Sequence, residues 1–560
     1  MSHRDCSKKP EEAVSPTASD SPFLILLVTV SALLTFLYFA SRNLHSPGLY
    51  YDECIFVNAA LGGINDDFIY LRLFNVPVMI MPYIGALKSF MYAPLFSLFG
   101  VTPESIRLPV ILLSAGTVSI SFLLARRLFG TQLALLFLVL MATDPAFIFN
   151  VRLDSGPVAL MLFFKMAALY SFFALLDSKA TRHAWFLVAA LALGLYDKLN
   201  FIWFVIALGG AALCCFGSEL KGLYHCMKRQ LLPPLILFVI VFFMAAATSL
   251  NLLLGFHGTM PDRTLLEKGL FVINLYKGTM NGSAIYNFVS GGSLTAPSWV
   301  NYLLIPLPIA LLAFTMARNR TSALLTCRQL RVPWFFLIAA LLIFIQIVVT
   351  REVGGAHHLM MLYPFHHLLV ISLFSSLLPL CGGVRRKLLF TCGAVAIVSI
   401  TCSQLKTDDA YASVFAGKST FSTRWDPHIY ALADYLKNSP ADVVVSTDWG
   451  IHVQLFCLAD RQSRLSYIDA WPAFKELAKY PADRQQWFYE NLFKNRRVLV
   501  ITHTQNAEVM TGTRANFAAF AGSHCKHVTL ENVFRNNVGE GLYEVYLVDD
   551  MIPERQGSAP

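Results

Sequence analysis

Two adjacent carboxylates, Asp52 and Glu53, follow closely on the first long apolar segment of the chain. A carboxylate at that position lies near the lipid headgroups, where it can meet a substrate carried by a lipid. It can remove a proton from a hydroxyl group as a general base, or bind a divalent cation through its oxygen atoms. An Asp-Glu pair in a loop is more often solvated surface, so the position of this pair makes it a candidate for chemistry.

Other charged residues stand at the ends of later apolar segments and are candidates for the same site. Each of them also has a structural alternative. Lys88 can anchor a helix at the interface by snorkelling, and Arg152 can form an ion pair with Asp154. His357 and His358 can simply mark the end of a span. Lys165 falls inside an apolar segment, where an ionisable residue is expensive and by default functional, and the sequence indicates no partner for it. The full set is Asp154, Lys88, Arg152, Lys198, Arg351, His357 and His358.

Several other polar groups carry weaker signals. Asp66–Asp67 and Asp144 are typical of solvated loops or helix caps. Asp448 and His452 suggest a hydrolase, but no nucleophile motif accompanies them. The eleven cysteines show neither CxxC spacing nor a Cys/His cluster, so they predict neither a zinc site nor a disulfide framework. Cys457 and Cys525 have two alternatives, a disulfide in an oxidising compartment or two free thiols.

The composition requires a membrane. Of 560 residues, 56% are hydrophobic and only 14% are charged, whereas a soluble domain carries about a quarter charged residues. The formal net charge is +9, but the basic residues recur in short clusters between apolar runs. That distribution is typical of orientation signals and argues against nucleic acid as a partner.

About eleven apolar segments are predicted to cross the ~30 Å hydrocarbon layer as helices. With a cytoplasmic N-terminus, every second loop is basic, as the positive-inside rule requires. The candidate residues then gather on the opposite face, in the loop 41–107 and in the short loops that contain Asp154, Lys198 and Arg351. A further loop on that face spans 254–298. Within the first loop, Met79 to Gly100 is predicted to be an interfacial helix. The segments are 23–40, 108–125, 131–149, 157–176, 184–196, 199–216, 232–253, 299–317, 333–350, 358–380 and 388–403.

Three regions follow from these patterns. Residues 1–22 are polar and predicted to be a disordered cytoplasmic tail, and 23–403 form the membrane region. Residues 404–560 have the composition of a soluble domain outside the membrane. There, DVVVSTDWG, RRVLVITHT and GLYEVYLVDD alternate with helical stretches, which predicts a small α/β domain. It has no nucleotide-binding glycine fingerprint.

The order of motifs resembles the GT-C superfamily of membrane glycosyltransferases, in particular bacterial members of the protein O-mannosyltransferase and aminoarabinose transferase family. The likeness covers roughly residues 20–400. YIGALKS stands where better-known members have Lys-Pro-Pro or Pro-Pro. The matching motifs are YYDE (50–53), RLP (107–109), ARRLFG (125–130), DPAFIFNVRLDSGP (144–157), LYDKLNF (195–201) and HHLMMLYPFHH (357–367).

The resemblance implies an inverting transfer of a sugar from a polyprenyl-phosphate carrier to a lipid, glycan or protein acceptor. Asp52 is then the base, Glu53 supports it or engages the acceptor, and Asp154 is the second acid of the site. A leaving phosphate needs cations to meet its growing charge; the candidates are Lys88, Arg152, Lys198, Arg351, His357 and His358. No cofactor is certain, and a divalent metal stays open.

The same resemblance implies a bacterial inner membrane, with the site and the C-terminal domain facing outside. Asn281-Gly282-Ser283 is a glycosylation sequon if the host is eukaryotic. The rival function is a transporter or flippase of a lipid-linked sugar. Transporters place ionisable residues near the midplane, whereas here the charges concentrate at one interface, which favours an enzyme.

Overall fold

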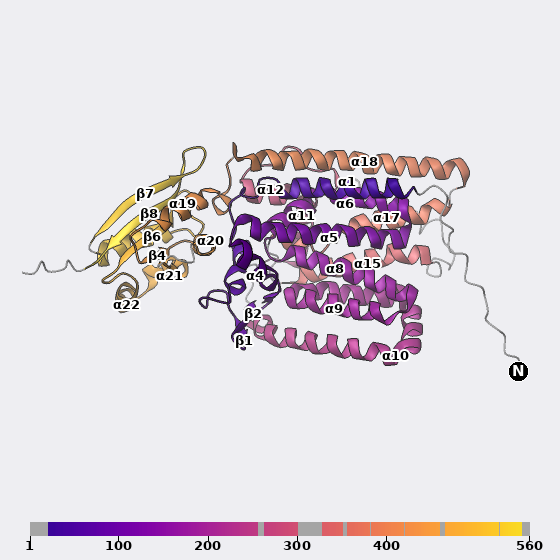
Figure 1. The fold of residues 1–560 in the computed structure, drawn as a ribbon, viewed down its shortest axis with the longest axis horizontal. Helices are drawn as coiled ribbons and strands as arrows, with labels where there is room; N and C mark the ends of the chain where they lie inside the picture. Colours follow the sequence, from indigo (N-terminus) through magenta and orange to yellow (C-terminus); the bar gives the residue numbers. More distant parts are fainter. Residues whose placement is uncertain are drawn as a thin grey trace, which may run out of the picture.

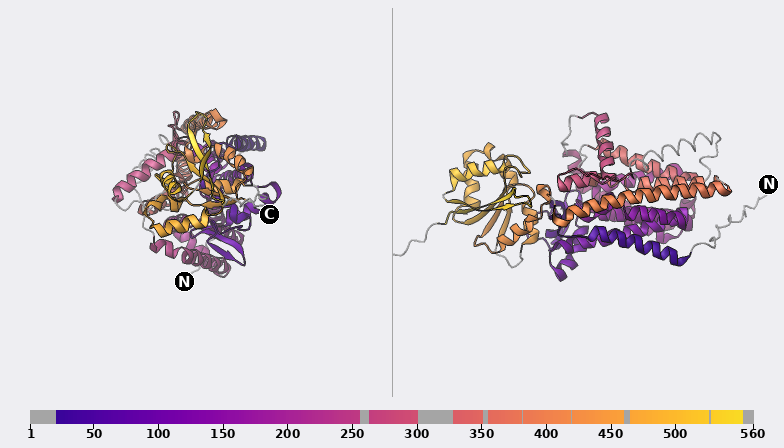
Figure 2. Two further views of the ribbon diagram at one scale, coloured as in Figure 1. Left: turned by 90° about the vertical axis from the view of Figure 1, so that its left-hand side faces the viewer. Right: turned by 90° about the horizontal axis from the view of Figure 1, so that it is seen from above.

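A computed structural model describes residues 21–255, 263–300, 328–350, 355–380, 382–418, 420–459, 465–525 and 527–551. Long helices run side by side in a bundle, and an α/β region is stacked on one end of it (Figure 1). Seen from above, the two parts are again arranged end to end (Figure 2). Most of the predicted tail, most of the predicted span 299–317 and Arg351 lie outside the described residues.

Among the described residues, six helices are long and apolar enough to cross a membrane, or seven if a bent pair counts as one span. The chain is therefore a multi-pass membrane protein, as the composition predicts, but the expected count of about eleven spans is not confirmed. The long helices are α1 (Pro22–Ser41), α5 (Pro103–Phe129), α8 (Val158–Ser178), α10 (Ile202–Gly255), α15 (Arg328–Val349) and α18 (Gly383–Ser413).

Shorter helices complete the bundle. The segments predicted as separate spans at 199–216 and 232–253 lie within α10, in which two helices meet at a kink with non-helical backbone at Phe216. The remaining helices are α9 (Thr181–Asp197), α11 (Leu265–Met280), α12 (Ser283–Ser290), α16 (Ala356–Leu359) and α17 (Phe365–Leu377).

The predicted straight span 131–149 is broken. It consists of α6 (Thr131–Ala142) and α7 (Pro145–Leu153), which meet at 54°. Proline disfavours helical backbone in the residue before it and lacks the N–H that would continue the ladder, so Pro145 begins a new helix. Asp144, just before it, caps α7 by accepting a hydrogen bond from the amide of Ala146.

The basic end of the bundle lies away from the α/β region. Arg127, near the end of α5, pairs with Asp177 near the end of α8 at 2.8 Å, and Arg331 of α15 pairs with Glu219. The basic start of α18 is at this same end, and α18 then runs back towards the α/β region (Figure 1). The charge asymmetry of the loops is thus also an asymmetry of the folded molecule.

The segment between α1 and α5 is more varied than the sequence predicts. It contains α2 (Tyr51–Cys54), α3 (Val57–Ala60), an antiparallel sheet and α4 (Leu87–Phe99). The prediction of a helix from Met79 is wrong over its first part, where β2 (Val76–Met81) pairs with β1 (Leu71–Leu73) and β3 (Ile84–Gly85). Strand pairing outweighs the amphipathic pattern here because Pro82 and Gly85 break any helix before α4 begins.

The C-terminal region is an α/β fold, as predicted. Its sheet has the strand order β5-β4-β6-β8-β7. Strand β4 pairs in parallel with β5 and β6, whereas β8 is antiparallel to β6 and β7. The strands are β4 (Val443–Ser446), β5 (Ser466–Asp469), β6 (Arg497–His503), β7 (Val528–Arg535) and β8 (Gly541–Asp549). The helices around them are α19 (His428–Lys437), α20 (His452–Leu458), α21 (Trp471–Glu476), α22 (Ala482–Leu492) and α23 (Thr513–His524).

Candidate functional site

The adjacent acids of the YYDE motif have different environments. Glu53 is fully buried, and both of its carboxylate oxygens face the guanidinium of Arg107, at 2.7 Å and 2.8 Å. It also accepts a hydrogen bond from the amide of Tyr50 at 2.9 Å, which caps α2. Arg107 in turn donates to the carbonyls of Leu44, Pro47 and Gly48. Glu53 and Arg107 therefore stabilise the backbone of α2 and of the segment before it, and α2 contains Asp52.

Asp52 is half-buried, and in the described part of the chain its carboxylate has no hydrogen-bond or ion-pair partner. Burial raises the pKa of Asp52 above its ordinary value, and the positive charges of Lys198 and Lys88 lower it in part. A carboxylate whose pKa is moved towards neutrality and whose oxygens are free is suited to accept a proton. Of the two acids, Asp52 has the properties of a base.

Asp154 forms a buried ion pair with Lys88, with 2.6 Å between the carboxylate oxygen Oδ2 and the amine. Its other oxygen accepts the amide of Ala159 in the first turn of α8. Asp154 itself caps α7 in the left-handed conformation, at φ 41°. This one side chain thus joins α4, α7 and α8. The sequence alternative of an Arg152–Asp154 pair is not what the structure shows.

Lys198 follows α9 and is buried, and no hydrogen bond or ion pair to its amine occurs within the described residues. Its charge interacts with those of Asp52, Asp154 and Asp197, and burial lowers its pKa below the ordinary value. Gly156 makes room for it, because a Cβ at that position would lie 2.9 Å from the amine nitrogen. A buried ammonium group without a protein partner is suited to bind an anion.

His357 and His358 lie in α16, with their ring centroids 4.2 Å apart. His357 approaches the same glycine, with its Cδ2 atom 3.7 Å from the Cβ position of Gly156. Burial and the charge of Lys198 lower the pKa of both histidines, that of His358 to about 3. They are therefore neutral hydrogen-bonding groups at neutral pH, whereas the sequence suggested cations.

Arg152 belongs to a different set of contacts. Its guanidinium donates to the backbone carbonyl of Phe39 in the last turn of α1 and to those of residues 42, 43 and 46, which follow this helix. It also lies over the ring of Phe415, at 4.5 Å from the centroid. These contacts favour a structural role over the expected phosphate contact, which stays a prediction. Arg351, the remaining expected cation, lies outside the described residues.

Two members of this environment were not among the sequence candidates. In the sequence, Arg107 belongs to the motif RLP (107–109), and a charged residue at the start of an apolar helix is itself a signal of pairing. Asp197 is fully buried, and neither of its carboxylate oxygens has a hydrogen-bond partner among the described residues. It lies beside Lys198 and interacts with the charges of Asp154 and Lys88. The adjacent Asp-Lys pair in LYDKLNF was the available signal.

Lys165, which had no partner in the sequence, is a tether. Its amine donates to the backbone carbonyls of Met360 and Met361 at 3.0 Å and 2.9 Å, and to that of Tyr363. These carbonyls belong to the turn between α16 and α17. Because Lys165 engages them and Pro364 follows, the predicted helix 358–380 begins only at Phe365.

The C-terminal region lies directly on α2. Tyr50 stacks on Trp425 with ring centroids 4.2 Å apart, and Tyr51 stacks on Trp449 at 4.6 Å. Beside them the thiol of Cys457 donates to the carbonyl of Cys54. Cys457 and Cys525 are both free thiols in this structure, which decides between the alternatives left by the sequence.

Other polar residues of the outer region pair within this interface or the α/β fold. Asp67 of the first outer loop contacts His452 of α20 at 3.0 Å, and Asp66 contacts Arg72 at 3.4 Å. Asp448 contacts His503 at 2.7 Å. These pairs agree with structural roles for the acids that the sequence analysis set aside.

Solved structures share this architecture over nearly the whole chain. The crystal structure of ArnT from Cupriavidus metallidurans in the apo state superimposes with a TM-score of 0.57 at 13% identity, covering 93% of this chain and 98% of that one. The same protein bound to undecaprenyl phosphate gives a TM-score of 0.55 at 12% identity, over 95% and 99% of the two chains. The chain therefore has a membrane fold of the GT-C type, similar to that of ArnT.

The sequence agrees with that class. Residues 86–243 match the family described as dolichyl-phosphate-mannose-protein mannosyltransferase, a stretch that contains Lys88, Arg152, Asp154 and Lys198. A search of curated proteins finds no match. The resemblance to the GT-C glycosyltransferases of the protein O-mannosyltransferase and aminoarabinose transferase type is thereby confirmed.

Proposed function

We propose that this protein is a glycosyltransferase that moves a sugar from a polyprenyl-phosphate carrier to an acceptor hydroxyl, with inversion and with Asp52 as the general base. Support for the donor class comes from the similar fold of ArnT, whose solved complex contains undecaprenyl phosphate. The proposed acceptor is a lipid, a glycan or a protein.

The observation that carries the proposal is that one acid of the pair is fully bound by protein groups and the other is not. Glu53 uses both oxygens on Arg107 and the amide of Tyr50, whereas Asp52, the residue before it, keeps its carboxylate free beside two lysines. A structural role accounts for Glu53 completely. It does not account for a free, half-buried Asp52 in a positive field.

The proposed reaction proceeds in one displacement. Asp52 accepts the proton of the acceptor hydroxyl while its oxygen attacks the anomeric carbon from the face opposite the phosphate. The bond between the anomeric carbon and the phosphate oxygen breaks, and its electron pair stays on the polyprenyl phosphate. Because attack and departure occur on opposite faces, the anomeric configuration is inverted.

Lys198 is proposed as the principal ligand of the leaving phosphate. Among the expected cations, Lys88 is already paired with Asp154 and Arg152 with backbone carbonyls, whereas Lys198 is buried without a partner of its own. His357 and His358 are proposed to add neutral hydrogen bonds. Fixed positive charge at a leaving group lowers the barrier because the charge it meets is larger in the transition state.

The site is proposed to face outside the cytoplasm, in a bacterial inner membrane. The basic loops lie at the far end of the bundle, and the positive-inside rule places that end in the cytoplasm. The α/β region then covers the site from outside, where it can select the acceptor. The transporter alternative loses its main support, because Lys165 is used as a backbone tether.

The proposal is tested with purified full-length protein, labelled polyprenyl-phosphate sugars and candidate acceptors. We expect Asp52→Asn to reduce turnover by about 10²–10⁴-fold, the typical contribution of a general base, with the unfolding temperature and donor affinity unchanged. Glu53→Gln is the matched control: it should instead lower the unfolding temperature, because the Arg107 charge is left unpaired. Equal turnover by wild type and Asp52→Asn contradicts the base assignment.

Metal dependence is tested in the same assay. Asp52, Asp154 and Asp197 share the site, so a divalent cation on carboxylate oxygens stays part of the proposal. Loss of turnover on adding a chelator, with recovery on adding Mg²⁺ or Mn²⁺, would support it. Movement of the intact donor across vesicles without bond breakage would contradict the enzyme function altogether.

A further inference from the structure

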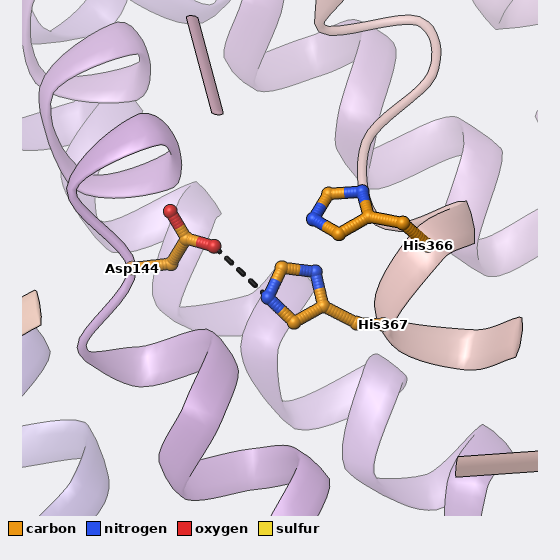
Figure 3. A group of neighbouring side chains, drawn as sticks. All are labelled: Asp144, His366 and His367. Carbon is orange, nitrogen blue, oxygen red and sulfur yellow. Dashed lines mark ion pairs between the residues drawn. The ribbon is translucent and has the colours of Figure 1, made fainter. Parts of the chain in front are cut away.

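A second polar cluster lies deeper in the bundle, at the other end of α7. Asp144 lies in the break between α6 and α7, and His366 and His367 lie in the first turn of α17. Their side chains point towards one another (Figure 3). All three are buried, with Asp144 and His367 fully enclosed. Nine residues of α7 separate this cluster from Asp154, about 14 Å at the helical rise, so it is distinct from the proposed catalytic site.

The geometry of the cluster resembles a metal site. One ligand atom from each residue can be chosen so that all three lie within 4.8 Å of one another. The Asp144 oxygen Oδ2 is 3.0 Å from the His367 nitrogen Nε2. In a tetrahedral zinc centre with bonds of about 2.0–2.1 Å, ligand atoms are about 3.4 Å apart. The three donors therefore need only small shifts to surround one ion.

The hydrogen bonds around the cluster leave its inner atoms free. The Asp144 oxygen Oδ1 accepts a hydrogen bond from the amide of Ala146, so the other oxygen, Oδ2, faces the two histidines. His366 contacts the hydroxyl of Tyr276 through Nδ1 at 3.0 Å, and its Nε2 has no hydrogen-bond partner in the described chain. A ligating histidine commonly has its second ring nitrogen held in this way.

The charge balance also favours a cation. Asp408 of α18 is fully buried close enough for its charge to interact with that of Asp144, and neither of its oxygens has a hydrogen-bond partner among the described residues. No lysine or arginine in the described chain forms an ion pair with either acid. Two uncompensated carboxylates in a dry interior are expensive, and one divalent ion neutralises both.

We propose that Asp144, His366 and His367 bind one divalent transition-metal ion, of which Zn²⁺ best suits two imidazoles and a carboxylate. The ion fastens the start of α17 to the break between α6 and α7. It thereby fixes α7, whose far end carries Asp154. Its role is structural, and it is independent of whether the proposed glycosyl transfer is correct.

The test measures metal directly on tag-free, full-length protein in detergent. The protein is loaded with Zn²⁺, dialysed extensively, and its zinc content is determined by mass spectrometry. We expect about one equivalent in wild type, its loss in His366→Asn and His367→Asn, and its retention in Asp52→Asn and Asp154→Asn. Tyr276→Phe keeps the ligands but removes their support, so its affinity should fall about 10–100-fold.

Replacement of zinc by Co²⁺ provides a second test on the wild-type protein, so it does not depend on whether a ligand variant folds. Wild type should show the visible absorption bands of cobalt bound to imidazole, and these bands should disappear when excess Zn²⁺ is added. A protein that keeps no zinc after dialysis and shows no such bands overturns the proposal. Zinc content that is equal in wild type and His367→Asn also overturns it, and the Asp144–His367 contact is then an ion pair without a metal.

Discussion

At the scale of single residues, the site depends on which charges are already paired. Glu53, Lys88 and Arg152 are engaged by protein groups, whereas Asp52 and Lys198 are not. The free groups are opposite in charge and close enough to influence each other's protonation. This arrangement links the pH dependence of the proposed reaction to Lys198.

The acid limb of the pH profile should therefore report Asp52. Burial raises its pKa above the ordinary value, so the base is protonated and inactive below that pKa, and kcat/KM rises with pH through it. In Lys198→Met, loss of the neighbouring positive charge raises this pKa further, and the acid limb should move to higher pH while the donor KM increases. Lys437→Met, at an exposed position at the end of α19, is the control. An unmoved limb in Lys198→Met would contradict the assignment.

The absence of a side chain at Gly156 should be required for the position of the Lys198 amine. It has a φ of +78°, which costs an L-residue about 1–2 kcal/mol, and a methyl group there would meet the Lys198 amine at 2.9 Å. We expect Gly156→Ala to raise the donor KM well beyond what its lower stability explains.

The control for Gly156→Ala is Gly512→Ala. Gly512 has a similar positive φ of +92°, but nothing lies within 4 Å of its Cβ position. Kinetic measurement beside thermal unfolding separates the two effects. If both variants lose stability equally and neither changes the donor KM, the role of Gly156 in seating Lys198 is wrong.

At the scale of elements, short polar contacts hold helices that hydrophobic packing alone would leave free to slide in lipid. Asp154 joins α4, α7 and α8, Arg107 joins the segment after α1 to α5, and Lys165 joins α8 to the turn before α17. Each contact pairs a charged side chain with a site-forming segment. The order of the site is thus a consequence of buried polar pairs between elements.

Lys165 tests this view without touching the reacting groups. In Lys165→Met, the carbonyls of Met360, Met361 and Tyr363 lose their donor, and each unsatisfied buried group costs about 1–3 kcal/mol. The unfolding temperature should fall, and hydrogen exchange should increase in the stretch 356–364. Lys179→Met, exposed at the basic end of α8, serves as the control. Unchanged exchange in Lys165→Met would show that the turn does not need its tether.

At the scale of the whole molecule, the α/β region and the bundle meet at the YYDE motif. The two tyrosines of that motif, which directly precede the proposed base, stack on Trp425 and Trp449. Sequence positions nearly 400 apart thus form one surface. The α/β region therefore forms one wall of the proposed site, on the side from which we propose that the acceptor approaches.

Removal of one stacking partner should weaken the contact between α2 and the α/β region. An aromatic pair contributes about 0.5–1.5 kcal/mol beyond its buried area, so Trp449→Ala should increase hydrogen exchange in Tyr51–Cys54 and raise the acceptor KM. Donor affinity should stay unchanged, because Lys198 lies in the bundle. Trp487, which is 62% exposed on α22, supplies the control variant Trp487→Ala. Normal acceptor kinetics in Trp449→Ala would exclude a role for this contact in acceptor binding.

The sequence alone determined the membrane character, the asymmetry of charge, the α/β character of the C-terminal region and the identity of Asp52 as a candidate. These follow from composition, periodicity and the order of motifs, which are local properties of the chain. Boundaries were less well determined. The helix breaks before Pro145 because proline ends the hydrogen-bond ladder, and the strand at Val76–Met81 depends on local competition between helix and sheet.

Only the tertiary structure decided which charged residues are free. Glu53 and Asp52 look alike in sequence, and so do Lys88 and Lys198, because pairing depends on partners dozens of residues away. Arg107 engages Glu53 from the start of another helix, and Asp144 meets His366 and His367 only because α6, α7 and α17 converge. In a low-dielectric interior such long-range pairing fixes the role of each charge, and no local pattern encodes it.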